Sequence, residues 1–511
     1  MSRKRIIGIF ILAFIMLGGL CPGWSLAADG GRNIDVVIIH MNDIHGNLIP
    51  MTDKKMAPEP EKVGGAAYIT GLIKKEKEAK GSAVILMNAG DLIPLPKEFS
   101  WEPVTTFVKD TGFDVSTLGN HDFDRGQAEL TRIVKALGHP VICANVVDAN
   151  GRFLPNVKPY LIKEVNGVKL GIIGLITPTT PAITLKKNVA GLEFLDPAAT
   201  TERYLPILKS KGARIIIVLS HLGVKDDEKL AKNVKGIDVI VGSHTHKVLI
   251  DPEVVDGTII LQAGSEGKYI GELSLQVEPV DYKIVGFTAK NELIPVLDKN
   301  IKPDPEVLAI VEKFDKEIAP LMNKVVGEAL EDFSKTPSAG FGDSQMGNLI
   351  ADSMREKTGS DIAFANSGGI RSVINKGTIK VETLYAVSPF PNYMAAMDLT
   401  GDKVLEVLEN GFSGNVKGFV QVSGAEVVYD LSKPEGSRIV EVKIGGAALD
   451  PKKTYRVSTV DFMANGGESY TGFLAGKNRI DTELARDVLG DYIKNHSPIK
   501  PVAPGRLRPV R

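Results

Sequence analysis

The chain has 511 residues, enough for two or more domains, and its hydrophobic fraction of 43% and charged fraction of 24% are those of an ordinary globular protein. Its formal net charge of −1 argues against a protein that binds nucleic-acid polymers or anionic membranes through a general basic surface. An anionic substrate would therefore have to meet local positive charge, from metal ions or from single arginines.

The N-terminus has the residue order of a secretory signal. A basic run at residues 3–5 precedes an apolar run at residues 6–20, and small residues lead up to Ala27. This order predicts a cleaved signal peptide over residues 1–27 and export to the periplasm or beyond. The apolar run is short for a membrane span, so no stable membrane insertion is expected.

The two cysteines bear on lipid anchoring and on disulfides. Cys21 raises the alternative of a lipid anchor, but Leu20 precedes it where a small residue would be expected, so soluble export is favoured. Cleavage near Ala27 would leave Cys143 as the single cysteine, which cannot form an internal disulfide. The exported fold is then expected to depend on its hydrophobic cores.

The first predicted strands each lead to potential metal ligands. Residues 34–41 form an apolar, β-branched run that predicts a strand, and Asp43 and His45 follow it. If the backbone stays extended there, the two side chains point to the same side, as a chelate requires. Residues 83–87 predict the next strand, which leads to Asp91. The two oxygens of that carboxylate can bridge two metals.

A strand predicted at residues 113–118 leads to Asn120, His121 and Asp124. Open α/β sheets bind ligands at the carboxyl ends of their strands. The Asn120 carbonyl can serve as a metal ligand, whereas the neighbouring His121 side chain diverges from it and is better placed to act on a substrate. Asp124 can hold that imidazole in one tautomer.

The remainder of the first half continues the alternation of strands and helices. Helices are predicted from about residue 64 to residue 80 and over residues 101–111. Two further predicted strands lead to His221, His244 and His246. The Asn166-Gly167 pair predicts the turn of a hairpin. The predicted strands of this part lie at residues 140–146, within 160–176, and at 214–219, 237–241, 258–262 and 269–276.

Five of the eight histidines therefore follow predicted strands, together with two aspartates and an asparagine. A lone histidine in such a place is usually a core or surface residue, but this convergence predicts a metal site. The residues by themselves do not divide the ligands between metal ions. The donors are carboxylate, amide and imidazole groups without a thiolate, which admits Zn, Mn or a mixed pair of divalent ions.

The series NDIHG, AGD, GNHDFD, SH and GSHTH, in this order, resembles the calcineurin-like metallophosphoesterases and, among them, the 5′-nucleotidase family. The resemblance covers nearly the whole chain after the predicted signal. It implies an α/β fold with a layered αββα metallophosphoesterase domain over residues 34–300, with metals at the carboxyl ends of strands. A connecting helix over residues 301–323 and a second, smaller α/β nucleotide-binding domain over residues 324–511 would follow.

The resemblance also implies a role for each residue of the series. One metal would be bound by Asp43, His45 and His246, and the other by Asn120, His221 and His244. Asp91 would bridge the two metals. His121 and Asp124 would form the catalytic dyad.

The second half begins with an amphipathic pattern over residues 304–322, which predicts a helix, and Asp343 is expected to cap another helix. A strand predicted at residues 361–365 leads to a loop with two glycines and Arg371. Glycines let backbone N–H groups approach an anion and Arg371 adds a fixed charge, although a plain tight turn explains the loop as well.

Phe390 and Phe462 each lie in a polar loop rich in Gly or Pro, with no obvious core to enter. Each ring can fold inward onto the domain or offer a face to a base. The resemblance implies that the two rings sandwich a nucleobase and that Glu468 contacts the ribose. The loop that would help to hold the nucleotide contains Asn366, Gly368, Gly369 and Arg371.

Four departures from the family pattern bear on the substrate. Gly342 stands where many members have an arginine, Glu468 where an aspartate is usual, and Tyr68 where an arginine often follows the double glycine. The segment after Asp91 lacks the customary Gly-Ser or Gly-Thr. None of these changes a predicted metal ligand, but together they affect the predicted phosphate and ribose contacts.

The sequence thus predicts an exported two-metal hydrolase that removes the 5′-phosphate of nucleotides, by in-line attack of a hydroxide that the metals generate. UDP-sugars, 2′,3′-cyclic nucleotides or a sulfur ester are alternative substrates within the family. A non-catalytic nucleotide-binding protein of the cell envelope is the alternative of another class. Such a protein would be expected to lose metal ligands or His121, and none is lost. The preferred base and the oligomeric state are not predicted.

Overall fold

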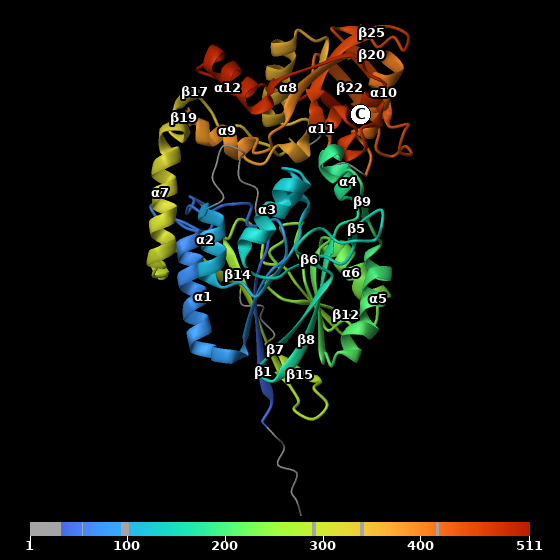
Figure 1. The fold of residues 1–511 in the computed structure, drawn as a ribbon. Helices are drawn as coiled ribbons and strands as arrows, with labels where there is room; N and C mark the ends of the chain where they lie inside the picture. Colours follow the sequence, from blue (N-terminus) through green and yellow to red (C-terminus); the bar gives the residue numbers. More distant parts are fainter. Residues whose placement is uncertain are drawn as a thin grey trace, which may run out of the picture.

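The run IDVVIIHM at Ile34–Met41 forms strand β1, and most of its side chains are buried on both faces of a sheet. The computed structural model describes residues 32–53, 55–92, 102–288, 293–337, 342–414 and 418–510. Within these ranges the chain is an α/β protein with an N-terminal lobe, lower in Figure 1, and a C-terminal lobe above it. The predicted signal peptide and Cys21 lie outside the described residues.

The N-terminal lobe is built on two β-sheets. In the first sheet, β1 pairs in parallel with β2 (Val84–Asn88), which pairs in parallel with β3 (Val115–Thr117). In the second sheet, β10 (Ile215–His221) lies in parallel between β8 (Val168–Ile176) and β11 (Val239–Val241). Because parallel strands end at the same edge, each sheet presents the polar residues that follow its strands together.

The two sheets pack face to face over aliphatic side chains, including the fully buried Ile38 of β1 and Ile217 of β10. Helices α1 (Ala66–Lys80), α2 (Glu102–Thr111) and α3 (Gln127–Leu137) cover the outer face of the first sheet. Helices α5 (Pro197–Ser210) and α6 (Val224–Asn233) cover the outer face of the second. The layer order is thus αββα, as predicted (Figure 1).

The hairpin predicted over residues 160–176 is confirmed. Strand β7 (Tyr160–Val165) pairs antiparallel with β8, and the two turn residues both have positive φ, as a type I′ turn requires.

The prediction of one strand over residues 140–146 is wrong. Strand β4 (Val141–Ile142) belongs to the first sheet, whereas β5 (Val146–Asp148) pairs with β9 (Leu192–Phe194) in a separate two-stranded sheet. Between them the buried Asn145 side chain exchanges two hydrogen bonds with the backbone of Ile176, at 2.7 and 3.0 Å. These bonds draw the chain out of the first sheet.

Helix α7 (Pro305–Met322) begins where the sequence predicts, and the Asp304 carboxylate caps it by accepting from two backbone N–H groups. It packs along α1 and α2 and leads into the C-terminal lobe (Figure 1). The centre of that lobe is a five-stranded sheet through β18 (Ile362–Asn366), β25 (Thr454–Val460) and β20 (Tyr393–Thr400). Among the helices of the described ranges, none is both long and apolar enough to span a bilayer.

The prediction that Asp343 caps the next helix, α8 (Gln345–Thr358), is wrong. Ser344 is the N-cap, and its Oγ accepts from the backbone N–H of Gly347 at 3.0 Å. The Asp343 carboxylate instead accepts from the backbone N–H groups of three residues near the C-terminus, Gly505, Arg506 and Leu507. It thereby fixes that segment beside the start of α8.

Candidate active site

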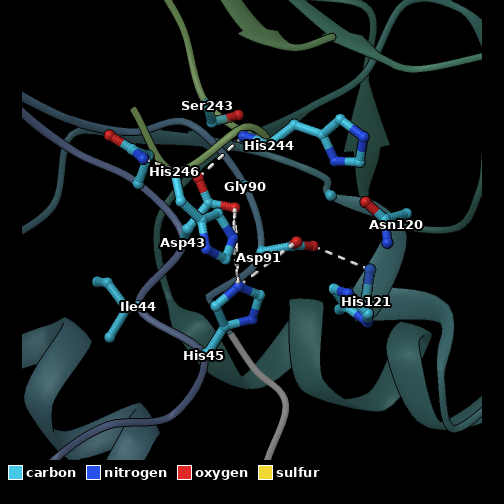
Figure 2. Close-up of polar contacts among 12 residues, drawn as sticks. Asp43, Ile44, His45, Gly90, Asp91, Asn120, His121, Ser243, His244 and His246 are labelled. Carbon is cyan, nitrogen blue, oxygen red and sulfur yellow. Dashed lines mark hydrogen bonds and ion pairs between the residues drawn. The ribbon is translucent and has the colours of Figure 1, made fainter. Parts of the chain in front are cut away.

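Side chains from the carboxyl ends of both sheets converge at one edge of the N-terminal lobe. They follow β1, β2 and β3 in the first sheet, and they end β10 or follow β11 in the second. Figure 2 shows the carboxylates of Asp43 and Asp91 directed toward the imidazole of His45, with His246 beside them. The seven residues predicted as metal ligands are thus neighbours: Asp43, His45, Asp91, Asn120, His221, His244 and His246.

Asp43, His45 and His246 form one group. Oδ1 of Asp43 lies 3.3 Å from Nε2 of His246 and 3.8 Å from Nε2 of His45, and the two Nε2 atoms are 3.1 Å apart. Oδ1 of Asp43 is buried and makes no hydrogen bond of ordinary geometry with the described residues. A buried anionic oxygen that faces two imidazole nitrogens suits a cation with mixed N and O ligands, so these residues fit a divalent metal.

Asp91 connects this group to a second one. Its Oδ2 lies 3.2 Å from Nε2 of His221 and 4.0 Å from Nε2 of His45. Oδ1 of Asn120 lies 3.2 Å from the same nitrogen of His221, and the ring centroid of His244 lies 5.1 Å from that of His221. One carboxylate therefore reaches ligand atoms of both groups.

The backbone beneath these residues is not extended, so the prediction that Asp43 and His45 converge through strand alternation is wrong. Both residues are left-handed, with φ of 51° and 52°, and so are Asp91, His244 and His246, with φ of 51°, 72° and 56°. Left-handed backbone costs a residue other than glycine about 1–2 kcal/mol. Such strain concentrates at functional sites, where the surroundings hold the backbone in place.

His121 lies beside the cluster on the short 3₁₀ helix Asn120–Phe123. Its backbone N–H donates to Oδ1 of Asp91 at 2.9 Å, while its side chain turns to Asp124, whose Oδ2 is 2.9 Å from Nδ1. The contact through Nδ1 orients the imidazole and leaves Nε2 for the cavity that the ring lines.

A cavity of about 360 Å³ is lined by both lobes. The N-terminal lobe contributes Asn120, His121, Asp124 and His244. The C-terminal lobe contributes every residue predicted to contact the substrate, namely Asn366, Gly368, Gly369, Arg371, Phe390, Phe462 and Glu468. The predicted dyad and the predicted substrate contacts thus share one space.

The two phenylalanines of the cavity have different partners. The ring of Phe390 stacks on the imidazole of His121, with centroids 5.1 Å apart and planes inclined by 16°, and the guanidinium carbon of Arg371 lies 5.8 Å from the Phe390 centroid. Phe462 packs over Gly467, where an added Cβ would lie 2.4–2.7 Å from ring atoms. Phe390 is therefore in contact with the predicted dyad itself.

Comparison with known proteins agrees with this layout. Residues 36–248 match the model of calcineurin-like phosphoesterases, and residues 325–475 match that of the 5′-nucleotidase C-terminal domain. A snake venom 5′-nucleotidase of Gloydius brevicauda is 31% identical over 95% of this chain and 90% of its own length. The chain belongs to the 5′-nucleotidase family.

The proteins similar to this chain are named for more than one activity. The structure of a 5′-nucleotidase precursor from Thermus thermophilus matches with a TM-score of 0.85 and 31% identity, over 93% of this chain and 99% of that one. Endonuclease YhcR of Bacillus subtilis is 30% identical over 93% of this chain, but the chain spans only 41% of that protein. As a 5′-nucleotidase family member, the chain is a phosphoester hydrolase, and its calcineurin-like half implies divalent metals.

Burial and mutual charge set the protonation of the site in this family member. Burial lowers the pKa of His45 and of His244 to about 3 each, so both rings are neutral and can offer a lone pair. Burial raises the pKa of Asp43, but the contact with His246 and the charge of His221 outweigh burial and lower it to about 2.

The pKa of His121 is shifted in the opposite direction to the pKa values of His45 and His244. Burial lowers its pKa, but the charges of Asp124 and Asp91 outweigh burial, and the pKa lies above its ordinary value. The two carboxylates therefore favour the protonated form of this ring, in contrast to the rings of His45 and His244.

Two residues that sequence reasoning missed support the dyad. Thr184 Oγ1 donates to Oδ1 of Asp124 at 3.4 Å, and Asn188 Nδ2 donates to its backbone carbonyl at 2.8 Å; both residues line the cavity. They follow α4 (Thr180–Ile183), which contacts Gly467–Ser469 of the C-terminal lobe. No strand leads directly to Thr184 or Asn188. A search for polar residues directly after predicted strands therefore does not find them.

Behind His221, the buried Asp227 accepts a short hydrogen bond from Ser220 Oγ, and its other oxygen has no hydrogen-bond partner among the described residues. Burial raises the pKa of Asp227 to about 8. The folded protein thus keeps a proton that the unfolded chain loses near pH 4, about the ordinary value for aspartate. This contribution to stability is complete below that pH and is lost as the pH rises toward about 8.

We expect Asp227→Asn, which is uncharged at every pH, to remove this part of the pH dependence. Its free energy of unfolding relative to wild type should increase from about pH 5 to about pH 8, as measured by urea denaturation. Asp226→Asn, on the exposed side of the same helix, is the matched control and should show no such trend. A constant difference between Asp227→Asn and wild type across this range would contradict the expectation.

Proposed function

We propose that the chain is an exported, two-metal 5′-nucleotidase. The observation that carries the proposal is the shared cavity: the His121–Asp124 pair, two predicted metal ligands and all seven predicted substrate contacts line one space between the lobes. Only a substrate with a phosphoester near the cluster and a flat, apolar group near Phe390 and Phe462 uses all of these residues. Export is proposed from the basic and apolar order of residues 3–20.

The proposed ligand sets follow the two geometric groups. Asp43, His45 and His246 would hold one divalent ion, Asn120, His221 and His244 the other, and Asp91 would contact both. Two divalent ions held there would activate water as a nucleophile and would neutralise phosphate charge. The mixed carboxylate, amide and imidazole donors admit Zn, Mn or one of each.

The chain's own groups then act on the rest of the substrate. His121, protonated and oriented by Asp124, donates a proton from Nε2 to the leaving 5′ oxygen. Arg371, with the backbone of Gly368 and Gly369, holds the anionic part of the nucleotide. The rings of Phe390 and Phe462 hold the base, and Glu468 accepts from ribose hydroxyl groups. In-line attack at phosphorus needs the phosphate to lie between the metal cluster and His121.

The metal site is tested by Asp91→Ala. Because the Asp91 carboxylate lies within 3.2–4.0 Å of ligand nitrogens from both groups, its loss should lower the content of both metals. Elemental analysis of the purified protein measures this. Asp91→Asn, which tolerates the left-handed backbone at φ 51°, separates lost charge from backbone strain and should also bind less metal. Near-wild-type occupancy in both variants would refute the assignment.

The dyad is tested by His121→Ala, which should lower kcat by about 10²–10⁴-fold, the range for a positioned proton-transfer group. Metal content should stay near that of wild type, because the bond to Asp91 comes from the backbone N–H and survives the substitution. Loss of metal together with activity would instead make His121 a ligand.

The substrate class is tested by a phosphate-release screen with added Mn or Zn, comparing AMP, UDP-glucose, 2′,3′-cyclic AMP and an aryl phosphate. AMP should be the best substrate of the wild type. Phe390→Ala and Phe462→Ala should each lower kcat/KM for AMP by about one to two decades, because stacking is worth about 1–3 kcal/mol per contact, and should change the aryl phosphate much less.

Phe462→Ala is the cleaner of the two variants, because Phe390 also touches His121. Equal losses on AMP and on the aryl phosphate for Phe462→Ala would point to a folding defect. An unchanged value for AMP in both variants would mean that the rings do not hold the base, and a preference for UDP-glucose or the cyclic nucleotide would replace the proposed substrate.

A further inference from the structure

The segment at residues 262–264, which follows β13 (Thr258–Leu261), contains no predicted ligand and does not line the cavity. It nevertheless lies between the two loops that carry Asp43 and His246. Its first residue, Gln262, has a fully buried side chain. A buried amide has to be hydrogen-bonded, so its partners show what it supports.

The Gln262 side chain makes three hydrogen bonds to the loop that carries His244 and His246. Nε2 donates to the carbonyl of Ser243 at 2.6 Å. Oε1 accepts from Oγ1 of Thr245 at 2.9 Å and from the backbone N–H of Lys247 at 2.5 Å. The amide thus fixes the residues before, between and after the two histidines.

Asn42 makes the corresponding contacts from the other loop. Its Oδ1 accepts from the backbone N–H of Ala263 at 2.9 Å, and its Nδ2 donates to the carbonyl of Gly264 at 2.6 Å and to Oδ2 of Asp43 at 2.7 Å. The same Oδ2 accepts from the backbone N–H of His244 at 2.9 Å, a contact drawn in Figure 2. One segment therefore connects both ligand loops.

These loops need such support because Asp43, His45, His244 and His246 are all left-handed. Residues other than glycine rarely adopt this conformation unless their surroundings hold it in place. Without the bonds from Gln262, a Ser243–Lys247 loop could relax to less strained conformations in which the two imidazoles no longer face Asp43 and His221. Partners outside the ligand set typically change metal affinity by about 10–100-fold when removed.

We propose that Gln262, acting with Asn42 through residues 262–264, is a positioning residue that sets the geometry of the metal ligands. The inference rests on the proposed metal site and adds residues that neither bind the metal nor touch substrate. Its measurable consequence is metal affinity, because the loop has to hold its left-handed form in the metal-free protein.

The test is calorimetric titration of Mn into metal-free full-length protein. Gln262→Met keeps the length of the side chain and removes all three hydrogen bonds, and it should weaken binding by about 10–100-fold. Gln262→Glu keeps the accepting oxygen and should lose less Mn affinity than Gln262→Met. Activity of Gln262→Met at low Mn should be reduced and should recover as Mn is raised.

Gln421→Met is the matched control. Gln421 is equally buried and also fixes a loop, since it accepts from the Ser344 N–H and donates to the Gly342 and Phe419 carbonyls, but it lies in the C-terminal lobe. Its variant should be destabilised to thermal unfolding like Gln262→Met and should keep wild-type Mn affinity.

Three outcomes would overturn the proposal: unchanged Mn affinity in Gln262→Met, equal losses of affinity in Gln262→Met and Gln421→Met, or no recovery of activity at high Mn. If Gln262→Met is not recovered folded, the Mn affinity of Gln262→Glu is compared with that of Gln421→Met instead, and equal affinities would overturn the proposal. Wild-type protein that binds no Mn or Zn would refute the proposed metal site itself, which distinguishes that failure from failure of the positioning role.

Discussion

Two carboxylates, Asp43 and Asp91, are buried where the strands of two sheets end, and the free-energy cost of burying their charge has to be offset. Asp43 accepts from the backbone N–H of His244, and Asp91 from that of His121. Imidazole nitrogens face the remaining oxygens. A divalent cation, which the family implies, would complete this environment. The αββα layers bring the strand ends of both sheets together at these carboxylates. The C-terminal lobe adds the residues that line the rest of the cavity.

Much of this arrangement is predictable because apolar strands lead directly to polar residues. That pattern predicted β1 and β2, and it indicated which side chains gather where the strands end. The 160–176 hairpin was predicted from its Asn166-Gly167 turn. Prediction from this pattern fails where contacts between residues far apart in the sequence determine the local structure. The range 140–146 is divided by the hydrogen bonds of the Asn145 side chain, and Ser344 rather than Asp343 caps α8 because Asp343 is held by the C-terminal segment. Thr184, Asn188 and Gln262 act through partners that local pattern does not reveal.

Two departures from the family pattern, Gly342 and Glu468, lie in the C-terminal lobe and have contacts that the structure describes. A Cβ at Gly342 would lie 2.7 Å from a ring carbon of Phe419, which itself stacks on Phe412 with centroids 4.7 Å apart. An arginine at that position would require the aromatic cluster to move. Glu468, one methylene longer than the usual aspartate, is left-handed at φ 48° and accepts from Nδ2 of Asn366 at 3.4 Å. Glu468 lines the cavity, whereas Gly342 does not, and neither residue is among the predicted metal ligands.

The left-handed backbone of the ligand loops limits how this site can change in evolution. Among residues other than glycine, asparagine, aspartate and histidine enter that conformation most readily, whereas β-branched and bulky residues strongly resist it. The five left-handed positions among the predicted ligands hold only aspartate and histidine. The residue types that suit a divalent ion are thus also the types that the backbone tolerates. A substitution to asparagine or glycine would preserve the loops and would weaken the proposed metal site, so activity would be lost before the fold.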